Sequence, residues 1–177
     1  MNSSGDELSP ALLARKVIDF YLKEGTIPDM PEDLPPEYYN RAGVFVSLKK
    51  DGQLRGCIGT VEPVQENLAE EIAANAVSAA VKDPRFAALD KKELPSLSVS
   101  VDVLGPMERI SSEDQLDPHQ YGVLVRSGSR SGLLLPNLDG VNTVKEQLDI
   151  ARRKAGIMPG QHEELYRFKV TRYGESD

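Results

Sequence analysis

Apolar residues recur at the spacing of an α-helix in three segments of this chain. The segments predict helices over residues 10–23, 64–82 and 143–155. Ser9 before Pro10 is the usual combination at a helix N-terminus, and Gly156 is a usual helix stop. Local signals therefore delimit the first and last helices.

A second set of segments shows the alternation and the β-branched residues of strands. They predict strands over residues 43–48, 53–60, 97–103, 121–126, 132–135 and 165–170. Asp51-Gly52 is a strong tight-turn signal, so the first two strands are expected to form a β-hairpin. The proline-rich segment 25–39 cannot continue a helix and is expected to be a long connection.

The length of 177 residues suits one domain, with room for a small subdomain. We expect a single domain over residues 1–177, with flexible ends at about 1–8 and 174–177. The composition, with 40% hydrophobic and 28% charged residues, is typical of a soluble globular protein. No secretory signal or membrane-spanning apolar run is visible, so we expect a cytoplasmic protein without a membrane partner.

Charge and motif content exclude several classes of function. The formal net charge of -7 argues against a nucleic-acid partner. The single cysteine allows no intrachain disulfide and fits a reducing compartment. Neither CxxC nor HExxH spacing occurs, and His119 and His162 are far apart, so we expect no metal and no cofactor. The sequence does not determine the oligomeric state.

The sequence Leu54-Arg55-Gly56-Cys57-Ile58-Gly59 lies in the second strand of the predicted hairpin. Strand alternation puts Arg55 and Cys57 on one face, about 6.5–7 Å apart at the backbone, so Arg55 can stabilise a thiolate or another anion. Gly56 and Gly59 allow a ligand or another backbone to approach closely. Two interpretations stay open: Cys57 is a candidate nucleophile, or it is a buried apolar residue while Arg55 forms an ion pair.

Polar residues near the second predicted helix are further candidates for binding. Asn75 lies near the small-residue face of that helix, where its amide either ties a neighbouring loop or lines a site. Asp83-Pro84-Arg85-Phe86 ends the helix. Asp83 and Arg85 either form a local ion-paired turn or act on a substrate as acid and clamp.

The sequence at 54–59 resembles the hallmark of the AMMECR family, which has the same Leu-Arg-Gly-Cys-Ile-Gly order. The resemblance continues through 75–76, 83–86, 93–104, 133–136, 154–156 and 166–168, and so covers nearly all of residues 11–173. It implies an α+β fold in which an antiparallel sheet is packed by helices, beside a smaller subdomain. The pattern of helices and strands agrees with that fold.

Prokaryotic members of the family resemble the A component of the AmmeMemoRadiSam system. This implies Memo-like and radical S-adenosylmethionine proteins as partners, with an unknown small molecule as a further candidate, but it implies no established reaction. Many relatives carry tryptophan before the last helix, whereas residues 137–142 here contain none. Two hypotheses follow: a reactive site centred on Cys57, or a non-catalytic binding module that uses the surface of 54–59.

Overall fold

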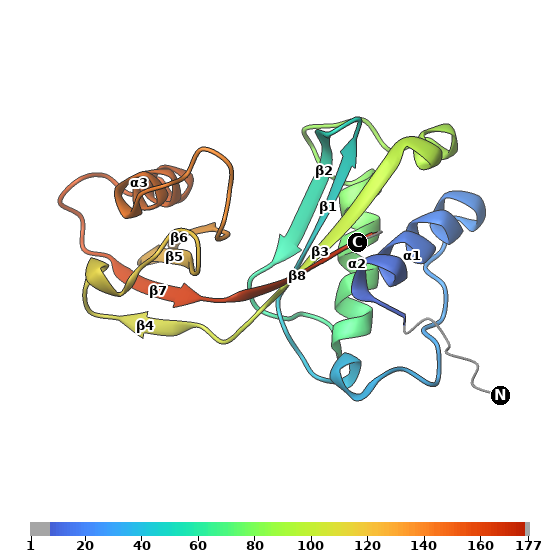
Figure 1. The fold of residues 1–177 in the computed structure, drawn as a ribbon, viewed down its shortest axis with the longest axis horizontal. Coiled ribbons are helices and arrows are strands. Elements are labelled where there is room, and N and C mark those ends of the chain that lie inside the picture. Colours follow the sequence, from blue (N-terminus) through green and yellow to red (C-terminus); the bar gives the residue numbers. More distant parts are fainter. Residues whose placement is uncertain (1–7, 176–177) are drawn as a thin grey trace. The chain divides into compact units, whose positions relative to one another are not determined.

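The structure, a computed structural model, describes residues 8–175 (Figure 1). The chain forms two compact units: unit 1 contains the residues up to Val103 and those from Arg172 onward, and unit 2 is Leu104–Thr171. Of the two expected flexible ends, residues 1–7 and 176–177 lie outside the described residues. Each unit contains a four-stranded antiparallel sheet with helical packing, which confirms the predicted α+β class.

The sheet of unit 1 has the strand order β2-β1-β3-β8. Its strands are β1 (Val44–Lys50), β2 (Gln53–Thr60), β3 (Leu97–Leu104) and β8 (Val170–Gly174). The predicted hairpin of β1 and β2 is confirmed, and Asp51 and Gly52 have φ angles of 52° and 78°, as a tight turn of this kind requires. Because β2 is an edge strand, the sequence at 54–59 lies at the border of the sheet.

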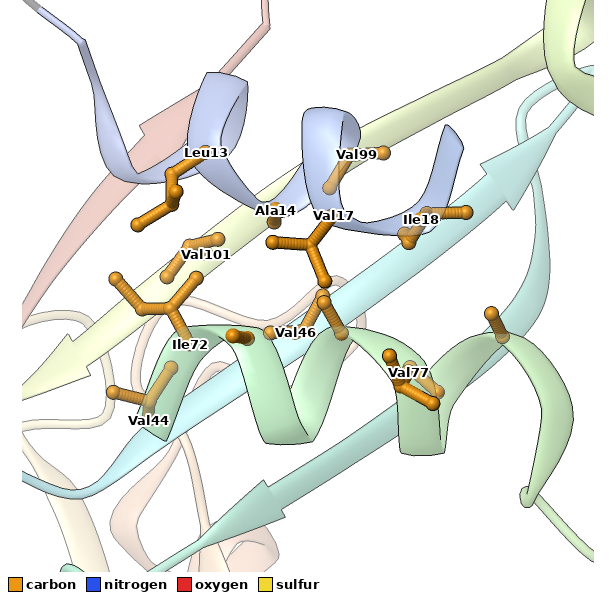
Figure 2. Packing of buried hydrophobic residues seen from close by; sticks show 14 of the residues in the cluster. Leu13, Ala14, Val17, Ile18, Val44, Val46, Ile72, Val77, Val99 and Val101 are labelled. Carbon is orange, nitrogen blue, oxygen red and sulfur yellow. The ribbon is translucent and has the colours of Figure 1, made fainter. Parts of the chain in front are cut away.

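Two helices, α1 (Pro10–Glu24) and α2 (Leu68–Val81), lie side by side on one face of this sheet (Figure 1). Apolar side chains from both helices and from β1 and β3 form the core of unit 1 (Figure 2). Those labelled in Figure 2 are Leu13, Ala14, Val17, Ile18, Val44, Val46, Ile72, Val77, Val99 and Val101. Alternate strand residues point to the other face of the sheet, among them Ser47 and Cys57.

Helix α2 begins at Leu68, and the prediction that it begins at residue 64 is wrong. Asn67 is the N-cap, and its side chain accepts a backbone hydrogen bond from the first turn. The buried Glu71 carboxylate accepts hydrogen bonds from the amides of Val64 and Gln65, at 3.0 and 2.6 Å. These bonds hold the residues before Asn67 in a turn, so they cannot join the helix.

The proline-rich connection after α1 ends in a short 3₁₀-helix, η1 (Pro36–Tyr39). Tyr38 is buried in the core of unit 1, and its hydroxyl donates to the backbone oxygen of Leu8. A second 3₁₀-helix, η2 (Lys91–Ser96), precedes β3. The connection therefore packs against the core of unit 1 through the buried Tyr38 and the partly buried Met30 and Leu34, and leaves most of its other residues at the surface.

The sheet of unit 2 has the order β4-β7-β5-β6. Its elements are β4 (Glu108–Ile110), η3 (Glu113–Gln115), β5 (Gly122–Ser127), β6 (Arg130–Leu134), α3 (Val144–Ala155) and β7 (Glu164–Phe168). The strands predicted over 121–126 and 132–135 are present as β5 and β6, and they form an antiparallel hairpin with a short turn, because Ser127 pairs with Arg130. The single strand predicted over 165–170 is wrong: β7 and β8 belong to different sheets and are separated at Lys169.

Candidate functional site

Strand β2 is irregular at Arg55. Leu48 of β1 pairs with Gly56 and Lys49 pairs with Leu54, so Arg55 has no partner residue on β1. An extra residue of this kind is a β-bulge, and it interrupts the alternation of side chains along the strand. The expectation that Arg55 and Cys57 share a face assumed regular alternation, which the bulge removes.

The Arg55 guanidinium binds the segment that precedes β3. Its Nε and Nη2 atoms donate to the Glu93 carboxylate at 3.0 and 3.1 Å, and its Nη1 donates to the Ala87 carbonyl at 2.9 Å. The hydrogen bonds from Arg55 to the carboxylate, together with those from the Asp90 amide and Lys50, lower the pKa of Glu93 to about 2. Arg55 therefore fixes the end of the hairpin to η2, and each of its three nitrogen atoms has a partner.

Cys57 is a free cysteine and a partly exposed residue, and its sulfur lies next to a hydroxyl. Its partner residue on β1 is Ser47, whose Oγ lies 3.2 Å from the Cys57 Sγ atom. The Cys57 amide donates to Asp83 Oδ2 at 3.0 Å, and its carbonyl accepts from Arg85 Nη2 at 3.3 Å. The amide and carbonyl of Cys57 thus point away from β1. Ser47 and Cys57 are therefore a non-hydrogen-bonded pair, the type in which the two residues of an antiparallel ladder lie closest together.

Asp83 and Arg85 form an ion pair that covers the edge of β2 at Cys57. The Asp83 carboxylate is 2% exposed and accepts from Arg85 Nη2 at 2.8 Å and Nε at 3.1 Å. The hydrogen bond from Arg85 is the main reason that the pKa of Asp83 is held well below its usual range. The pKa of Arg85 is raised by this hydrogen bond and, to a smaller extent, by Coulombic attraction to Asp83 and to Cys57.

The Arg85 guanidinium remains accessible in spite of this pairing. Its side chain is 55% exposed, compared with 16% for Arg55. It lies over the Phe86 ring at 5.4 Å from the centroid, and its Nη1 atom makes no hydrogen bond to any residue in the range 8–175. Arg85 is therefore the cation near Cys57 that retains donors for an external anion.

Packing within unit 1 accounts for both glycines of the motif. A Cβ atom on Gly56 would lie 2.2 Å from the carbonyl oxygen of Ala79 in α2. A Cβ atom on Gly59 would lie 2.3 Å from the ring of Phe45 on the neighbouring strand. The close approach expected at these positions is thus made by a helix backbone and by an aromatic side chain.

Asn75 lies in the interface between α2 and the hairpin and is 5% exposed. Its amide nitrogen donates to the Val44 carbonyl at 3.0 Å and to Thr60 Oγ1 at 3.1 Å. The Thr60 hydroxyl in turn donates to the buried Glu71 carboxylate at 2.6 Å. Both amide hydrogens are therefore used inside the fold, and none of these contacts involves Cys57.

The structure brings Cys57, Asp83 and Arg85 together and pairs Arg55 with Glu93. The sequence reasoning missed Ser47 and Glu93. Ser47 had a weak signal, because it is a small polar residue in an apolar strand, whereas Glu93 is 38 residues from Arg55 and had none. His119 and His162 both belong to unit 2, and no histidine contacts Cys57 among the described hydrogen bonds.

No group of three or more histidine, cysteine, aspartate or glutamate residues suited to a metal ion occurs between residues 8 and 175. In the same range, no helix is long and apolar enough to cross a membrane. The described site thus offers three chemical groups to a ligand: a thiol, a neighbouring hydroxyl and a guanidinium.

Comparison with known proteins gives one matching family model, AMMECR1, over residues 11–176. A Thermotoga maritima protein is 49% identical over 163 residues, which cover 90% of this chain and 94% of that protein. A Clostridium acetobutylicum protein is 50% identical over 166 residues, which are 93% of this chain. This chain spans only about a third of the length of the Clostridium protein, since the match covers 35% of it.

The fold has a counterpart among solved structures. The crystal structure of an uncharacterized protein from Pyrococcus horikoshii matches with a TM-score of 0.87 and 34% identity, over 94% of this chain and 90% of that chain. The names of these three relatives state no activity. The comparisons therefore establish relatedness and fold, and the chemistry of the site has to be argued from its geometry.

Proposed function

Since this chain belongs to the AMMECR1 family, we propose that its hallmark sequence at 54–59 forms a cysteine-centred functional site. Cys57 is the reactive thiol of this site, and Arg85 binds the negatively charged part of the molecule that reaches it. One observation carries the proposal. The carboxylate of Asp83 holds both the Cys57 amide and the Arg85 guanidinium, which keeps an exposed cation beside a partly exposed cysteine.

The proposal gives the two arginines different roles. Arg55 directs all three nitrogen atoms to Glu93 and Ala87 and is mostly covered, so it positions β2. Arg85 keeps its Nη1 atom and about half of its surface free for a ligand. An arginine with unused donors is the usual protein group for binding a carboxylate or a phosphate.

Ser47 is the residue that orients the thiol. Its hydroxyl lies 3.2 Å from Cys57 Sγ, within the distance at which either atom can donate a hydrogen bond. When the sulfur is ionised, the hydroxyl donates to it and stabilises the nucleophile. Asn75, Gly56 and Gly59 support the site indirectly, because they fix β2 against α2 and β1.

The setting of this site belongs to the same proposal. We place the protein in the cytoplasm, where a single cysteine stays reduced. Residues 1–177 act as one domain of the family type. Its partners are Memo-like and radical S-adenosylmethionine proteins, and its ligand is a small molecule with an anionic group. Resemblance to the A component of the AmmeMemoRadiSam system supports the partners, and the exposed Arg85 supports the anionic ligand.

The second candidate function is a non-catalytic binding module. It is favoured by the absence of a histidine or other base among the described hydrogen bonds of the Cys57 side chain, which contacts Ser47. In this alternative, the surface of 54–59 contacts a protein or a small ligand, and Cys57 fills space in the strand. Cys57→Ser then leaves binding unchanged, whereas the thiol-centred proposal requires the sulfur.

Alkylation kinetics test the proposal directly, because the chain has one cysteine and the reaction reports only on Cys57. Iodoacetate carries a negative charge and iodoacetamide is neutral. Arg85→Gln is expected to lower the rate constant for iodoacetate about two- to fivefold and that for iodoacetamide much less. This range corresponds to the loss of one exposed charge interaction of up to about 1 kcal/mol.

Arg153→Gln is the matched control, because Arg153 is an exposed arginine of unit 2 and its loss changes the net charge equally. This control should leave both rate constants unchanged. A Cys57 thiol that reacts with neither reagent in the folded protein between about pH 6 and pH 9 would reject the reactive thiol. If Arg85→Gln lowers the rate constants for both reagents equally, the anion-binding role of Arg85 is rejected, but the reactive thiol is not.

A further inference from the structure

A cavity of about 330 Å³ lies in unit 1, between the connection that follows α1 and the first half of α2. Its apolar wall includes Ile27, Met30 and Ala74, and its polar wall includes Asp29 and Glu70. The volume is at the lower end of the range of small-molecule sites, about 300–1,000 Å³. The cavity is thus large enough to hold one side chain of a binding partner. It is too small to enclose a large cofactor.

Apolar side chains are exposed on the surface around this cavity. Ile27, which lines it, is 46% exposed. Val64, adjacent to the lining residue Gln65, is 71% exposed. Single exposed apolar residues are ordinary, but apolar residues beside a concave site indicate a binding surface. Covering them removes apolar area from water, which favours binding.

The two segments that contribute to the cavity are acidic and contain no lysine or arginine over residues 24–40 and 62–71. Their exposed acidic residues include Glu24, Asp29, Glu32, Asp33, Glu37 and Glu66. Within residues 8–175, Asp29, Glu66 and Glu70 have no ion-pair partner. Their carboxylates give the surface around the cavity a negative potential, and the described cation beside it is Arg41, which donates to the Gln65 carbonyl.

Arg41 follows the first acidic segment, and its hydrogen bonds go elsewhere. Its guanidinium donates to the carbonyl oxygens of Pro63 and Gln65, at 3.0 and 3.1 Å. Arg41 therefore holds the 63–65 segment in place beside the cavity. The wall formed by Gln65 is therefore already ordered before any ligand binds. This lowers the entropy cost of binding.

We propose that this cavity and its acidic rim are the docking site for a basic segment of a partner protein, with one aliphatic side chain in the cavity and lysine or arginine residues on the rim. Charge complementarity selects this occupant, because unpaired carboxylates attract cations and repel acidic peptides and nucleic acids. The proposal goes beyond the cysteine-centred function, since no residue that lines the cavity belongs to the motif at 54–59 or to Asp83–Arg85.

A synthetic peptide tests the proposal with the full chain. The probe has two leucines flanked on both sides by lysine and arginine, and its binding is followed by amide chemical shifts of ¹⁵N-labelled protein. We expect the largest shifts at residues 27–30 and 65–74. Replacing both leucines by serine should weaken binding at least about tenfold, because the side chain in the cavity then no longer buries apolar surface.

Asp29→Lys places a cation on the rim and is expected to weaken binding about five- to tenfold, since it replaces an attraction by a repulsion. Asp139→Lys is the matched control, because Asp139 is an exposed carboxylate of unit 2 and the change in net charge is the same. Equal weakening by both substitutions, or shifts spread evenly over the surface, would mean that only the net charge binds the peptide and would overturn the proposal.

Sedimentation of the free chain measures whether it dimerises. It therefore tests whether the cavity is occupied by a second copy of this chain instead of a basic segment of a partner. If the chain dimerises with Asp29 and Ile27 protected from exchange, the cavity is a self-association site and the proposal fails. If Asp29→Lys weakens peptide binding while Cys57 alkylation is unchanged, the docking site stands independently of the cysteine-centred function.

Discussion

Gly56 shows how a residue without a side chain determines the position of the thiol beside it. The backbone of α2 comes so close that a Cβ atom would lie 2.2 Å from the Ala79 oxygen. Backbone atoms cannot move aside as a flexible side chain can, so any larger residue would push β2 away from the helix. Gly59 is different, because its close neighbour is the ring of Phe45. The two glycines therefore allow β2 to pack closely against α2 before Cys57 and against Phe45 after it.

The ion pair of Arg55 and Glu93 predicts how stability depends on pH. The pKa of Glu93 falls from its usual value of 4.5 to about 2 on folding, chiefly through the hydrogen bond from Arg55. A lowered carboxyl pKa stabilises the fold above the unfolded value, and this contribution disappears as the pH falls through the folded value. The contribution of Glu93, at most about 3 kcal/mol, is therefore expected to be lost between about pH 5 and pH 2.

Urea unfolding of the wild type and of Glu93→Gln measures this contribution. The difference in unfolding free energy between the two proteins should be large at pH 7 and should shrink steadily below about pH 5. Glu66→Gln serves as the control, because Glu66 is exposed and forms no ion pair with the described residues. A difference for Glu93→Gln that is equally large at about pH 3 contradicts the assignment to ionised Glu93.

At the scale of elements, the edge of β2 is protected by a turn. Unpaired main-chain groups on an edge strand readily bind another strand, and proteins cover them in several ways. Here Asp83 accepts from the Cys57 amide and Arg85 donates to its carbonyl, so the turn after α2 closes the edge at the thiol. The same turn both protects the strand and carries the proposed anion-binding arginine.

Asp83→Ala removes the acceptor that holds both the Cys57 amide and the Arg85 guanidinium. The unfolding free energy should fall by about 2–3 kcal/mol, because an ionised acceptor is lost and a buried donor is left without a partner. Hydrogen exchange of the Cys57 amide should accelerate. In the control Asp90→Ala, which removes the cap of η2, exchange should accelerate near Lys92 only. Unchanged exchange at Cys57 in Asp83→Ala would contradict the edge-protection role.

The elements with local signals were predicted well, and those defined by distant partners were not. The cap at Ser9 and the turn at Asp51-Gly52 appear in the sequence within a few residues of their effect, and both are present in the structure. The start of α2 was predicted incorrectly, because the Glu71 carboxylate holds Val64 and Gln65 in a turn. Strand β4 has three residues, too few to show alternation.

At the scale of the whole molecule, unit 1 is built from two separated parts of the chain. The segment from Arg172 onward completes it through two ion pairs, Arg172 with Asp102 and Arg15 with Glu175, each at 2.7 Å. The Glu175 carboxylate also accepts from the amide of Val99 in β3. Unit 1 therefore depends on residues that the ribosome makes only after the whole of unit 2.

A chain that ends at Thr171 is expected to melt at a lower temperature, because Asp102, whose side chain is 4% exposed, loses its partner. An uncompensated buried charge costs about 3–5 kcal/mol. A chain that ends at Glu175 is the control and should melt like the full chain. Circular dichroism measures the melting temperatures of both truncated chains. In the same experiment, the full chain should unfold in one transition if residues 1–177 form one domain. Equal melting temperatures of the two truncated chains would contradict the role assigned to the last strand.

The sequence by itself determined the α+β class, the hairpin that carries Cys57, and the ends of α1 and α3, because hydrophobic periodicity, caps and tight turns act over a few neighbouring residues. Only the tertiary structure decided which arginine contacts Cys57. Arg55 is two residues from Cys57 but binds Glu93, whereas Asp83 and Arg85 reach Cys57 from 26 and 28 residues away. Such partners depend on the bulge in β2 and on the packing of α2 against the sheet, which arise from long-range contacts that no local pattern encodes.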